Sequence, residues 1–432
     1  MNRFIRKIQS NKYRVISITL AVTLGATTFN LTGCAQIEEA LEIYKRREEI
    51  HSYQQEENTT PDIIIVEKVE ELDASENADV SELPAKDFAK ARDELLPESG
   101  GLKYYAYDKL SEEDKVLYTE IYSILSTHAK DTKVSSIDPD QIEKAFNYVM
   151  LDHPELFYLT GYSFTKYMRG NKVEKITVSG SYTMSASQAE VAKLSVDAYV
   201  DKCTSGYEGP IDEYEKVKYV YDYLIKNTEY DLSAPNNQNI LSVVKEGRTV
   251  CQGYAKMMQY MLNKMGVFCI LAEGTVKGTE SHVWNIVRIN NEYYHVDATW
   301  GDASYMIEDN AEGFEAPEVN YDYLCITDEE VLKTHVIKDN IELPKCDSME
   351  ANYYVKEGLY LTELNTGIIM EAFENARING DKIVTLKCEN ANVYTAVFNH
   401  LIENHAIFDY LDGSATVNYV EFRDACRISF YI

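Results

Sequence analysis

The spacing of apolar residues predicts a largely helical region between residues 104 and 265. Apolar side chains recur there every three or four positions, which is the period of a helix with one buried face. Ser111 followed by Asp114, and Asp138 followed by Pro139, supply the residue types that open a helix. The pattern predicts helices after both caps and over residues 186–203, 211–227 and 251–265.

Two hairpins are predicted from β-prone runs that flank polar turn residues. The runs are 162–168 and 172–182 around Gly170-Asn171, and 283–289 and 293–299 around Asn290-Asn291. If Asn290 and Asn291 form the second loop, residue 289 pairs with 292 and residue 282 pairs with 299. Because side chains alternate between the faces of a strand, His282, Trp284 and Asp297 then share one face.

That register places His282 and Asp297 diagonally across the hairpin, within reach of a hydrogen bond. We expect the carboxylate to hold the Nδ1–H of the imidazole, which leaves Nε2 for a nucleophile. A single histidine on a strand is more often structural, so the pairing matters only if a nucleophile lies nearby.

Cys251 is the candidate nucleophile, because it stands where the predicted helix begins. The positive end of the helix dipole favours a thiolate, which is the reactive form of cysteine. Taken alone, Cys251 would more often be a small buried apolar residue. A cysteine at a helix start together with a His–Asp hairpin face instead predicts a Cys251–His282–Asp297 triad.

Three motifs around these residues resemble the transglutaminase-like superfamily, which is related in architecture to papain-like cysteine peptidases. The motifs are GRTVCQGYA at 247–255, SHVWNIV at 281–287 and YYHVDATWGD at 293–302. Further stretches resemble bacterial extracellular members: DHPELFYL at 152–159, YDYLIKNTEYD at 221–231 and YDYLCITDEEVLKTH at 321–335. The resemblance implies an α+β fold, with the cysteine helix packed on an antiparallel sheet that carries the histidine and the aspartate.

The resemblance also implies a thiol enzyme that acts on peptide or glutamine-type amides as a protease, a deamidase or a transglutaminase. Members stabilise the oxyanion with a group upstream of the cysteine, for which Tyr230 is a candidate; a packed tyrosine is the alternative. Gln252 follows the nucleophile and offers its backbone N–H. Trp284 and Trp300 flank the triad as cleft wall or as core. The competing hypotheses are a surface binding module that no longer uses its triad, and a structural wall protein.

The N-terminus resembles a lipoprotein signal peptide over residues 1–33. A basic start precedes an apolar run that is short for a membrane span, and Leu-Thr-Gly leads into Cys34. Lipid on Cys34 would hold the protein on the outer face of a cell membrane, and an uncleaved N-terminal anchor is the alternative. Protein or cell-wall peptide is then the expected substrate. We expect a monomer.

The whole chain is strongly acidic, with a formal net charge of −29 at pH 7, and removal of residues 1–33, which hold five basic and no acidic residues, would make it −34. This balance argues against nucleic acid as a partner. Residues 34–100 are expected to form an acidic spacer, with a strand at 61–72 as the alternative. The catalytic domain is expected over 101–345, including a helical and hairpin extension at its N-terminal side.

A small α+β domain is expected over residues 346–432. Strands are predicted at 353–361, 382–388, 417–421 and 426–431, and helices at 367–376 and 393–404. The chain has eight cysteines but no CxxC and no EF-hand spacing, so neither a metal nor another cofactor is predicted. An outside location would permit a disulfide between Cys388 and Cys426, whereas Cys251 should stay unpaired.

Overall fold

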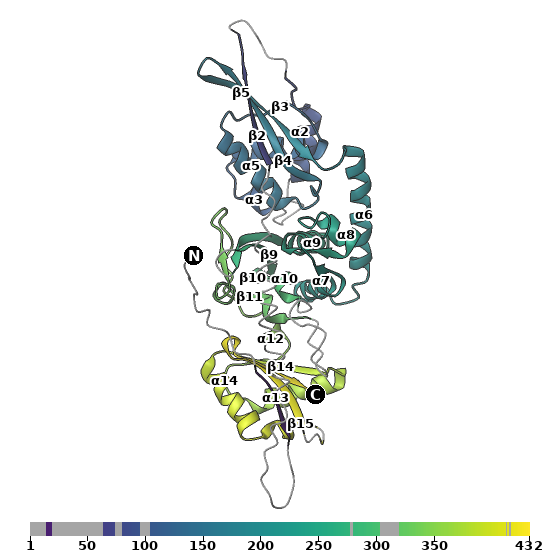
Figure 1. The fold of residues 1–432 in the computed structure, drawn as a ribbon, viewed down its shortest axis with the longest axis vertical. Helices are drawn as coiled ribbons and strands as arrows, with labels where there is room; N and C mark the ends of the chain where they lie inside the picture. The colour runs from purple at the N-terminus through teal and green to yellow at the C-terminus, as the bar shows by residue number, and fades with distance from the viewer. Residues whose placement is uncertain are drawn as a thin grey trace, which may run out of the picture. The chain divides into compact units, whose positions relative to one another are not determined.

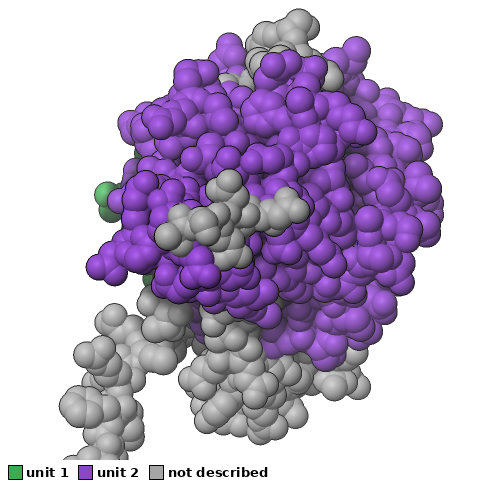
Figure 2. All heavy atoms as spheres, turned by 90° about the horizontal axis from the view of Figure 1, so that it is seen from above, with its two compact units in different colours: residues 1–53, 303–317, 349–432 green, residues 54–302, 318–348 purple. Residues whose placement is uncertain are grey.

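The computed structural model describes residues 14–19, 64–73, 80–95, 104–276, 280–302, 319–411, 413 and 416–432 (Figure 1). The chain divides into two compact units. The larger unit comprises residues 54–302 and 318–348, and the smaller unit comprises 1–53, 303–317 and 349–432. Figure 2 colours the larger unit purple and the smaller unit green.

A four-stranded sheet organises the N-terminal part of the larger unit. Its strands, in order across the sheet, are β2 (Ile64–Glu71), β4 (Leu159–Arg169), β5 (Lys172–Tyr182) and β3 (Thr132–Lys133). The accompanying helices are α2 (Ala85–Leu95), α3 (Tyr105–Asp108), α4 (Glu112–Thr127) and α5 (Pro139–Asp152). Ser111 and Asp138 cap α4 and α5 as the sequence predicts, and the β4–β5 hairpin turns at Gly170.

Residues 34–100 contribute β2 and α2 to this fold, so the spacer interpretation is wrong for these segments and the alternative, a strand within 61–72, is confirmed. β2 pairs in parallel with β4 along its whole length, from Ile64 opposite Gly161 to Glu71 opposite Met168. Every β2 side chain is exposed. The backbone of a neighbouring edge strand can pair with a polar strand just as well as with an apolar one, so composition alone was a poor guide here.

A five-stranded antiparallel sheet forms the centre of the larger unit. Its order is β11 (Leu324–Ile326), β10 (Glu292–Val296), β9 (Glu280–Ile289), β8 (Cys269–Val276) and β12 (His335–Ile337). Asn290 and Asn291 both have positive φ, which suits the tight turn between β9 and β10. Residue 289 pairs with 292, as predicted.

Helices cover the central sheet, and α9 (Cys251–Lys264) packs on its strands β8 and β9. α9 also contacts α7 (Glu213–Asn227) and α8 (Ile240–Glu246). The remaining elements are α6 (Ala186–Ser205), β6 (Glu229–Tyr230), β7 (Arg248–Thr249), α10 (Ala298–Gly301), a 3₁₀ turn η2 (Tyr321–Tyr323) and α11 (Asp328–Val331). The Asn285 amide donates to the carbonyl of Ala255 at 2.9 Å and thereby ties α9 to β9.

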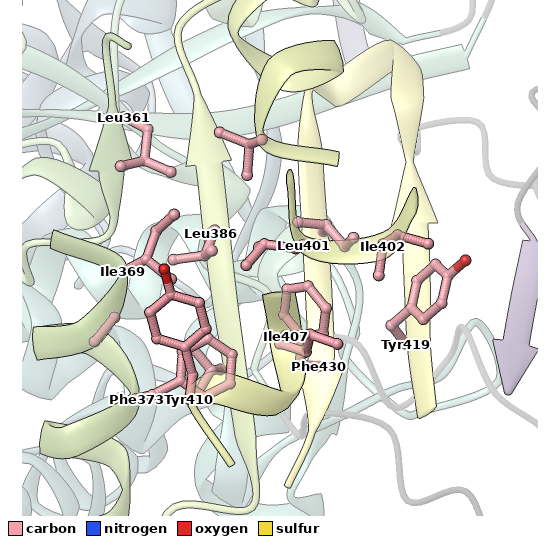
Figure 3. Close-up of a cluster of buried hydrophobic side chains, with 14 of the residues drawn as sticks. Leu361, Ile369, Phe373, Leu386, Leu401, Ile402, Ile407, Tyr410, Tyr419 and Phe430 are labelled. Atoms are coloured by element: carbon pink, nitrogen blue, oxygen red, sulfur yellow. The ribbon is translucent and has the colours of Figure 1, made fainter. Parts of the chain in front are cut away.

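The smaller unit packs helices on a second five-stranded sheet. The sheet order is β1 (Arg14–Thr19), β15 (Thr416–Phe422), β16 (Arg427–Tyr431), β14 (Ile383–Cys388) and β13 (Tyr360–Leu361). The helical elements are α12 (Tyr353–Lys356), α13 (Thr366–Asn379), α14 (Ala391–Phe398), the π turn η3 (Asn399–Glu403) and the 3₁₀ turns η4 (Ala406–Asp409) and η5 (Arg423–Ala425). Figure 3 shows its apolar core, where Phe373 of α13 meets Tyr410 and Phe430.

One expectation for the smaller unit is wrong, and a disulfide that the sequence left open is not formed. The predicted strand at 353–361 is a short helix followed by the two-residue strand β13, because Asn352 caps the helix and Gly358 turns the chain with φ 68°. Cys388 and Cys426 are both free thiols, although the backbone N–H of Cys388 donates to the carbonyl of Cys426 at 2.8 Å.

The predicted signal peptide lies mostly outside the described residues, and so does Cys34. Within residues 1–33 the structure describes only β1, whose backbone pairs antiparallel with β15. Among the described residues, none of the helices combines the length and the apolar composition needed to span a membrane.

Candidate active site

Cys251 is the first residue of α9, as predicted, and a tight local structure fixes its position. Val250 precedes it as an extended N-cap residue. The hydroxyl of Thr249 donates to the carbonyl of Asn237 at 2.8 Å and accepts from Ser242 at 2.6 Å. Only 5% of Cys251 is exposed, and its thiol is free.

Gly253 allows the first turn of α9 to sit directly on Thr249. A Cβ atom added at Gly253 would lie 1.8 Å from the Thr249 hydroxyl oxygen, far inside contact distance. That hydroxyl is held from both sides, so it has little room to move. The glycine therefore sets where α9 begins, and with it the position of Cys251.

His282 and Asp297 meet as the hairpin register predicts, at 2.7 Å. The nitrogen that faces the carboxylate is Nε2, which corrects the expectation that Asp297 would bind Nδ1. Nδ1 is therefore the nitrogen left for the thiol, and His282 and Cys251 interact through a side-chain hydrogen bond.

Asp297 directly follows β10, whose last residue is Val296, so the predicted strand at 293–299 extends three residues too far. Its Oδ1 accepts the backbone N–H groups of Thr299 and Trp300 at 3.0 and 3.2 Å, which opens the short helix α10. Aspartate is a preferred N-cap residue, and here the cap also fixes the orientation of the carboxylate. Oδ2 is thereby turned toward His282.

Charges in this buried site reinforce one another. Burial by itself would lower the pKa of His282, but the charge and hydrogen bond of Asp297 and the contact with Cys251 raise it to about 10. Burial would raise the pKa of Asp297, but His282 and then His335 hold it well below its usual range. The structure therefore favours an imidazolium beside an ionised carboxylate, which is the state that stabilises a neighbouring thiolate.

His335 is the site residue that the sequence did not predict. It begins β12, and its Nε2 lies 3.1 Å from the same Oδ2 of Asp297 that binds His282. Its side chain is fully buried. The only sequence signal was the resembling stretch at 321–335, which ends on this histidine; nothing in its spacing placed it beside Asp297.

The four secondary candidates have different surroundings. Trp284 is 1% exposed and lies in the core, where it stacks over His282, so it does not line a cleft. Trp300 is half-buried and contacts the His335 and His282 rings at centroid distances of 5.1 and 6.4 Å. Gln252 is the half-buried second residue of α9. Tyr230 pairs with Thr249 through β6 and β7, so its backbone lies near the start of α9.

Another buried histidine, His295, lies on β10. His295 of β10 uses both ring nitrogens: Nδ1 accepts from the Trp284 indole at 2.9 Å, and Nε2 faces Asp328 at 2.9 Å. Cys346 lies beside Asp328 and donates its backbone N–H to that carboxylate at 3.2 Å. Burial lowers the pKa of His295 more than Asp328 raises it.

Donor atoms converge in both of these groups. The nearest atoms of His282, Asp297 and His335 lie within 4.8 Å of one another, and those of His295, Asp328 and Cys346 do so as well. Such spacings would suit a transition-metal ion, which prefers imidazole, carboxylate and thiolate ligands. The hydrogen bonds within each group account for the spacing without an ion, so we assign both groups as hydrogen-bonded networks.

The segment that contains the three site residues matches a known protein family. The model of the transglutaminase-like superfamily matches residues 197–298, a segment that contains Cys251, His282 and Asp297. Residues 197–298 thus match the transglutaminase-like superfamily, as the motifs suggested, and this segment includes α9, β9 and β10.

Individual relatives match over short segments. The kyphoscoliosis peptidases of Mus musculus and Homo sapiens are each 26% identical over 103 residues, which is 20% of this chain. The match spans only 16% of the length of these curated relatives.

Two solved structures are also similar. A crystal structure of a TGase matches with a TM-score of 0.25 and 13% identity, over 36% of this chain and 48% of that one. A candidate cysteine protease from Cytophaga hutchinsonii matches with a TM-score of 0.21 and 19% identity, over 24% and 36% of the two chains.

Proposed function

We propose that this protein is a thiol enzyme that acts on peptide or carboxamide carbonyls, with Cys251 as nucleophile, His282 as acid and base, and Asp297 as the group that orients His282. The observation that carries the proposal is that one buried imidazole interacts with both the Cys251 thiol and, through Nε2, the Asp297 carboxylate. A structural histidine would need only one of these partners.

The reaction follows from these positions. The Cys251 sulfur forms a bond with the carbonyl carbon, and the displaced π electrons make an oxyanion. The carbon–nitrogen bond then breaks, and the proton on His282 leaves with the ammonia or amine. Water or a second amine attacks the resulting thioester, gives a proton back to His282, and restores the thiol side chain.

The oxyanion has donors available at the start of α9. The first backbone N–H groups of a helix lack acceptors within that helix, and in α9 these belong to Cys251 and Gln252. An N–H group that points at the developing charge stabilises the transition state. The Gln252 backbone N–H is the donor that we propose for this role, and the Tyr230 hydroxyl is a second candidate.

Alkylation of the thiols tests the proposed nucleophile before any substrate is known. Iodoacetamide should modify Cys251 below pH 7, because a thiolate paired with an imidazolium persists where an ordinary thiol is protonated. Cys426, the half-buried member of the described cysteines, provides the internal control and should be modified more slowly than Cys251 at that pH. Peptide mass spectrometry of the quenched protein distinguishes the two. Equal pH dependence at both positions would contradict the proposal.

Turnover on a peptide library then tests the reaction itself. Wild-type protein should release ammonia or cleave amide bonds, and Cys251→Ala should be inactive. Added primary amines separate cross-linking from hydrolysis, because only a transferase incorporates them. A Cys251→Ala variant that retains the full biological effect would favour a binding module instead.

We further propose that lipid on Cys34 anchors the protein at the outer face of the cell membrane, where envelope proteins or cell-wall peptides would be its substrates. The support is the signal-like order of residues 1–34. Cell fractionation compares wild-type protein with Cys34→Ala. Wild-type protein should partition with membranes, and the variant should not.

A further inference from the structure

Two histidines compete for one oxygen atom of the triad carboxylate. His282 approaches Oδ2 of Asp297 at 2.7 Å, and His335 approaches the same atom at 3.1 Å. The other ring nitrogen of His335 lies 2.8 Å from the Thr334 hydroxyl. A neutral imidazole that faces a carboxylate carries its proton on that side, which leaves Nδ1 as an acceptor. The Thr334 hydroxyl has a longer contact of 3.3 Å with the Val331 carbonyl, so Nδ1 is its nearer acceptor and this bond favours the Nε2–H form of His335.

We propose that His335 is a positioning residue of the triad, which shares Oδ2 of Asp297 with His282 and so limits how tightly the carboxylate holds the catalytic imidazole. This inference rests on the proposed function, because it assigns His335 a role in the same acid–base chemistry. Its physical basis is that a hydrogen bond to an anion withdraws charge from the accepting oxygen.

The alternative role would be to hold the carboxylate in place, and the structure argues against it. Oδ1 of Asp297 already accepts two backbone N–H groups, from Thr299 and Trp300. These bonds fix the carboxylate plane whether His335 is present or not. Removing His335 therefore does not release Asp297; it leaves more negative charge facing His282.

The surroundings of His282 exclude water that could replace the hydrogen bond from His335 to Asp297. The groups that face it are Cys251 from α9, Asp297 at the start of α10 and His335 from β12, together with the Trp284 and Trp300 rings. Tyr323 lies beyond His335 at a centroid distance of 6.0 Å. Asp297, His282 and His335 are each at most 5% exposed, so little water can replace the missing donor.

The consequence for catalysis is directional. An imidazolium that binds its proton too strongly is a poor acid toward a leaving amine. By weakening the hold of Asp297, His335 makes His282 a better proton donor. A protonated His335 would act in the same direction, because like charges repel.

The test measures the proton affinity of His282 directly, so it does not depend on a known substrate. The full chain carries ¹⁵N-labelled histidine in a Cys251→Ala background, and the His282 signals are titrated by NMR. His335→Met removes the donor at similar volume, and the pKa of His282 should rise by about 0.5 to 1 unit. His335→Gln retains an N–H at nearly the same place and should restore the wild-type value.

A milder variant protects the test if His335→Met does not fold. Thr334→Val removes the hydroxyl that fixes the tautomer of His335 and should raise the pKa of His282 in the same direction, by less. His295→Gln is the matched control, since His295 is equally buried and also faces a carboxylate, but not Asp297. It should leave the pKa of His282 unchanged.

Each result decides the inference separately from the proposed function. A pKa of His282 that falls or stays constant in His335→Met and Thr334→Val would overturn it. Once a substrate is known, His335→Met should lower kcat about 10-fold with little change in KM, because substrate contacts are untouched. If the wild-type protein has no turnover, the proposed function fails, whereas a constant His282 titration refutes only the role of His335.

Discussion

The described residues of the larger unit include two groups of one cysteine, one histidine and one aspartate, and the order of the three side chains differs between them. Cys251, His282 and Asp297 form the first group, and Cys346, His295 and Asp328 the second. In the first, the imidazole lies between the thiol and the carboxylate. In the second, the carboxylate of Asp328 interacts with both the imidazole and the thiol.

This difference in order has opposite electrostatic consequences. The imidazole of His282 can take a proton from the thiol, and its pKa is raised to about 10. In the second group, burial and then the charge of Asp328 raise the pKa of the Cys346 thiol, which keeps it protonated. Trp284 occupies the remaining nitrogen of His295. Residue types alone therefore do not make a thiol nucleophile; the imidazole must separate the two acidic groups.

The largest effect in this comparison is expected from neutralising the Asp297 carboxylate, with Asp328 as the matched position in the second group. Asp297→Asn should lower kcat/KM by about 10³- to 10⁴-fold, because His282 loses both its orienting group and its counter-charge. The basic limb of the pH–activity profile should also move to lower pH. Asp328→Asn is the matched variant in the second group and should change kcat/KM only a few-fold. Steady-state kinetics from pH 5 to 10 compares the two, and equal losses would refute the distinction.

The second prediction concerns a substitution that moves the Cys251 thiol but leaves all three triad residues in the sequence. Gly253→Ala should shift the first turn of α9 and reduce activity by about 100-fold or more, since misplacement of a reacting group by ~1 Å has that effect. Gly367→Ala, at the first turn of α13 in the smaller unit, is the control. A Cβ at Gly367 meets only the Asn365 side chain at 3.2 Å. If Gly253→Ala is fully active, α9 is not fixed by Thr249.

The third prediction uses the opposite pKa shifts of the two histidines. The raised pKa of His282 contributes stability that is complete below about pH 6.5 and is lost as pH rises through about 10. The lowered pKa of His295 instead costs stability as pH falls below about 6.5. The free energy of unfolding should thus decline by about 2–4 kcal/mol between pH 7 and 10, since one pKa unit corresponds to ~1.4 kcal/mol.

Urea unfolding followed by tryptophan fluorescence measures this decline. The chain has two tryptophans, Trp284 and Trp300, and both belong to the larger unit, so the signal reports that unit. Asp297→Asn should flatten the slope between pH 7 and 10. A slope that persists in this variant would mean that other groups cause it.

The smallest effect is expected from the second thiol. Cys346→Ala should cost about 1 kcal/mol of stability, which is the burial of one small apolar group, and leave activity unchanged. Cys251→Ala should abolish activity. Loss of activity in Cys346→Ala at unchanged folding would give the second group a function that its geometry does not suggest.

Local patterns predicted much of the fold. The caps at Ser111 and Asp138, the start of α9 at Cys251 and the Asn290–Asn291 turn all lie where the sequence placed them. Each depends on interactions among residues close in sequence, which spacing can reveal. The hairpin register also brought His282 and Asp297 together, because the alternation of side chains fixes which residues share a face.

Long-range contacts decided the rest. The choice of His282 nitrogen that meets Asp297, the burial of Trp284 and the pairing of β2 with β4 all depend on how separate elements pack, which local spacing does not report. The clearest case is His335. It is 38 residues from Asp297 and joins the triad only because β12 pairs with β8 at the edge of the sheet.

The sequence by itself thus determined the chemical groups of the site and the short elements that carry them. The tertiary structure decided their order in space, and so which cysteine faces an imidazole and which faces a carboxylate. The physical reason is that side-chain periodicity is set by the backbone of a single element, whereas electrostatic coupling depends on distances between elements and on the exclusion of water around them.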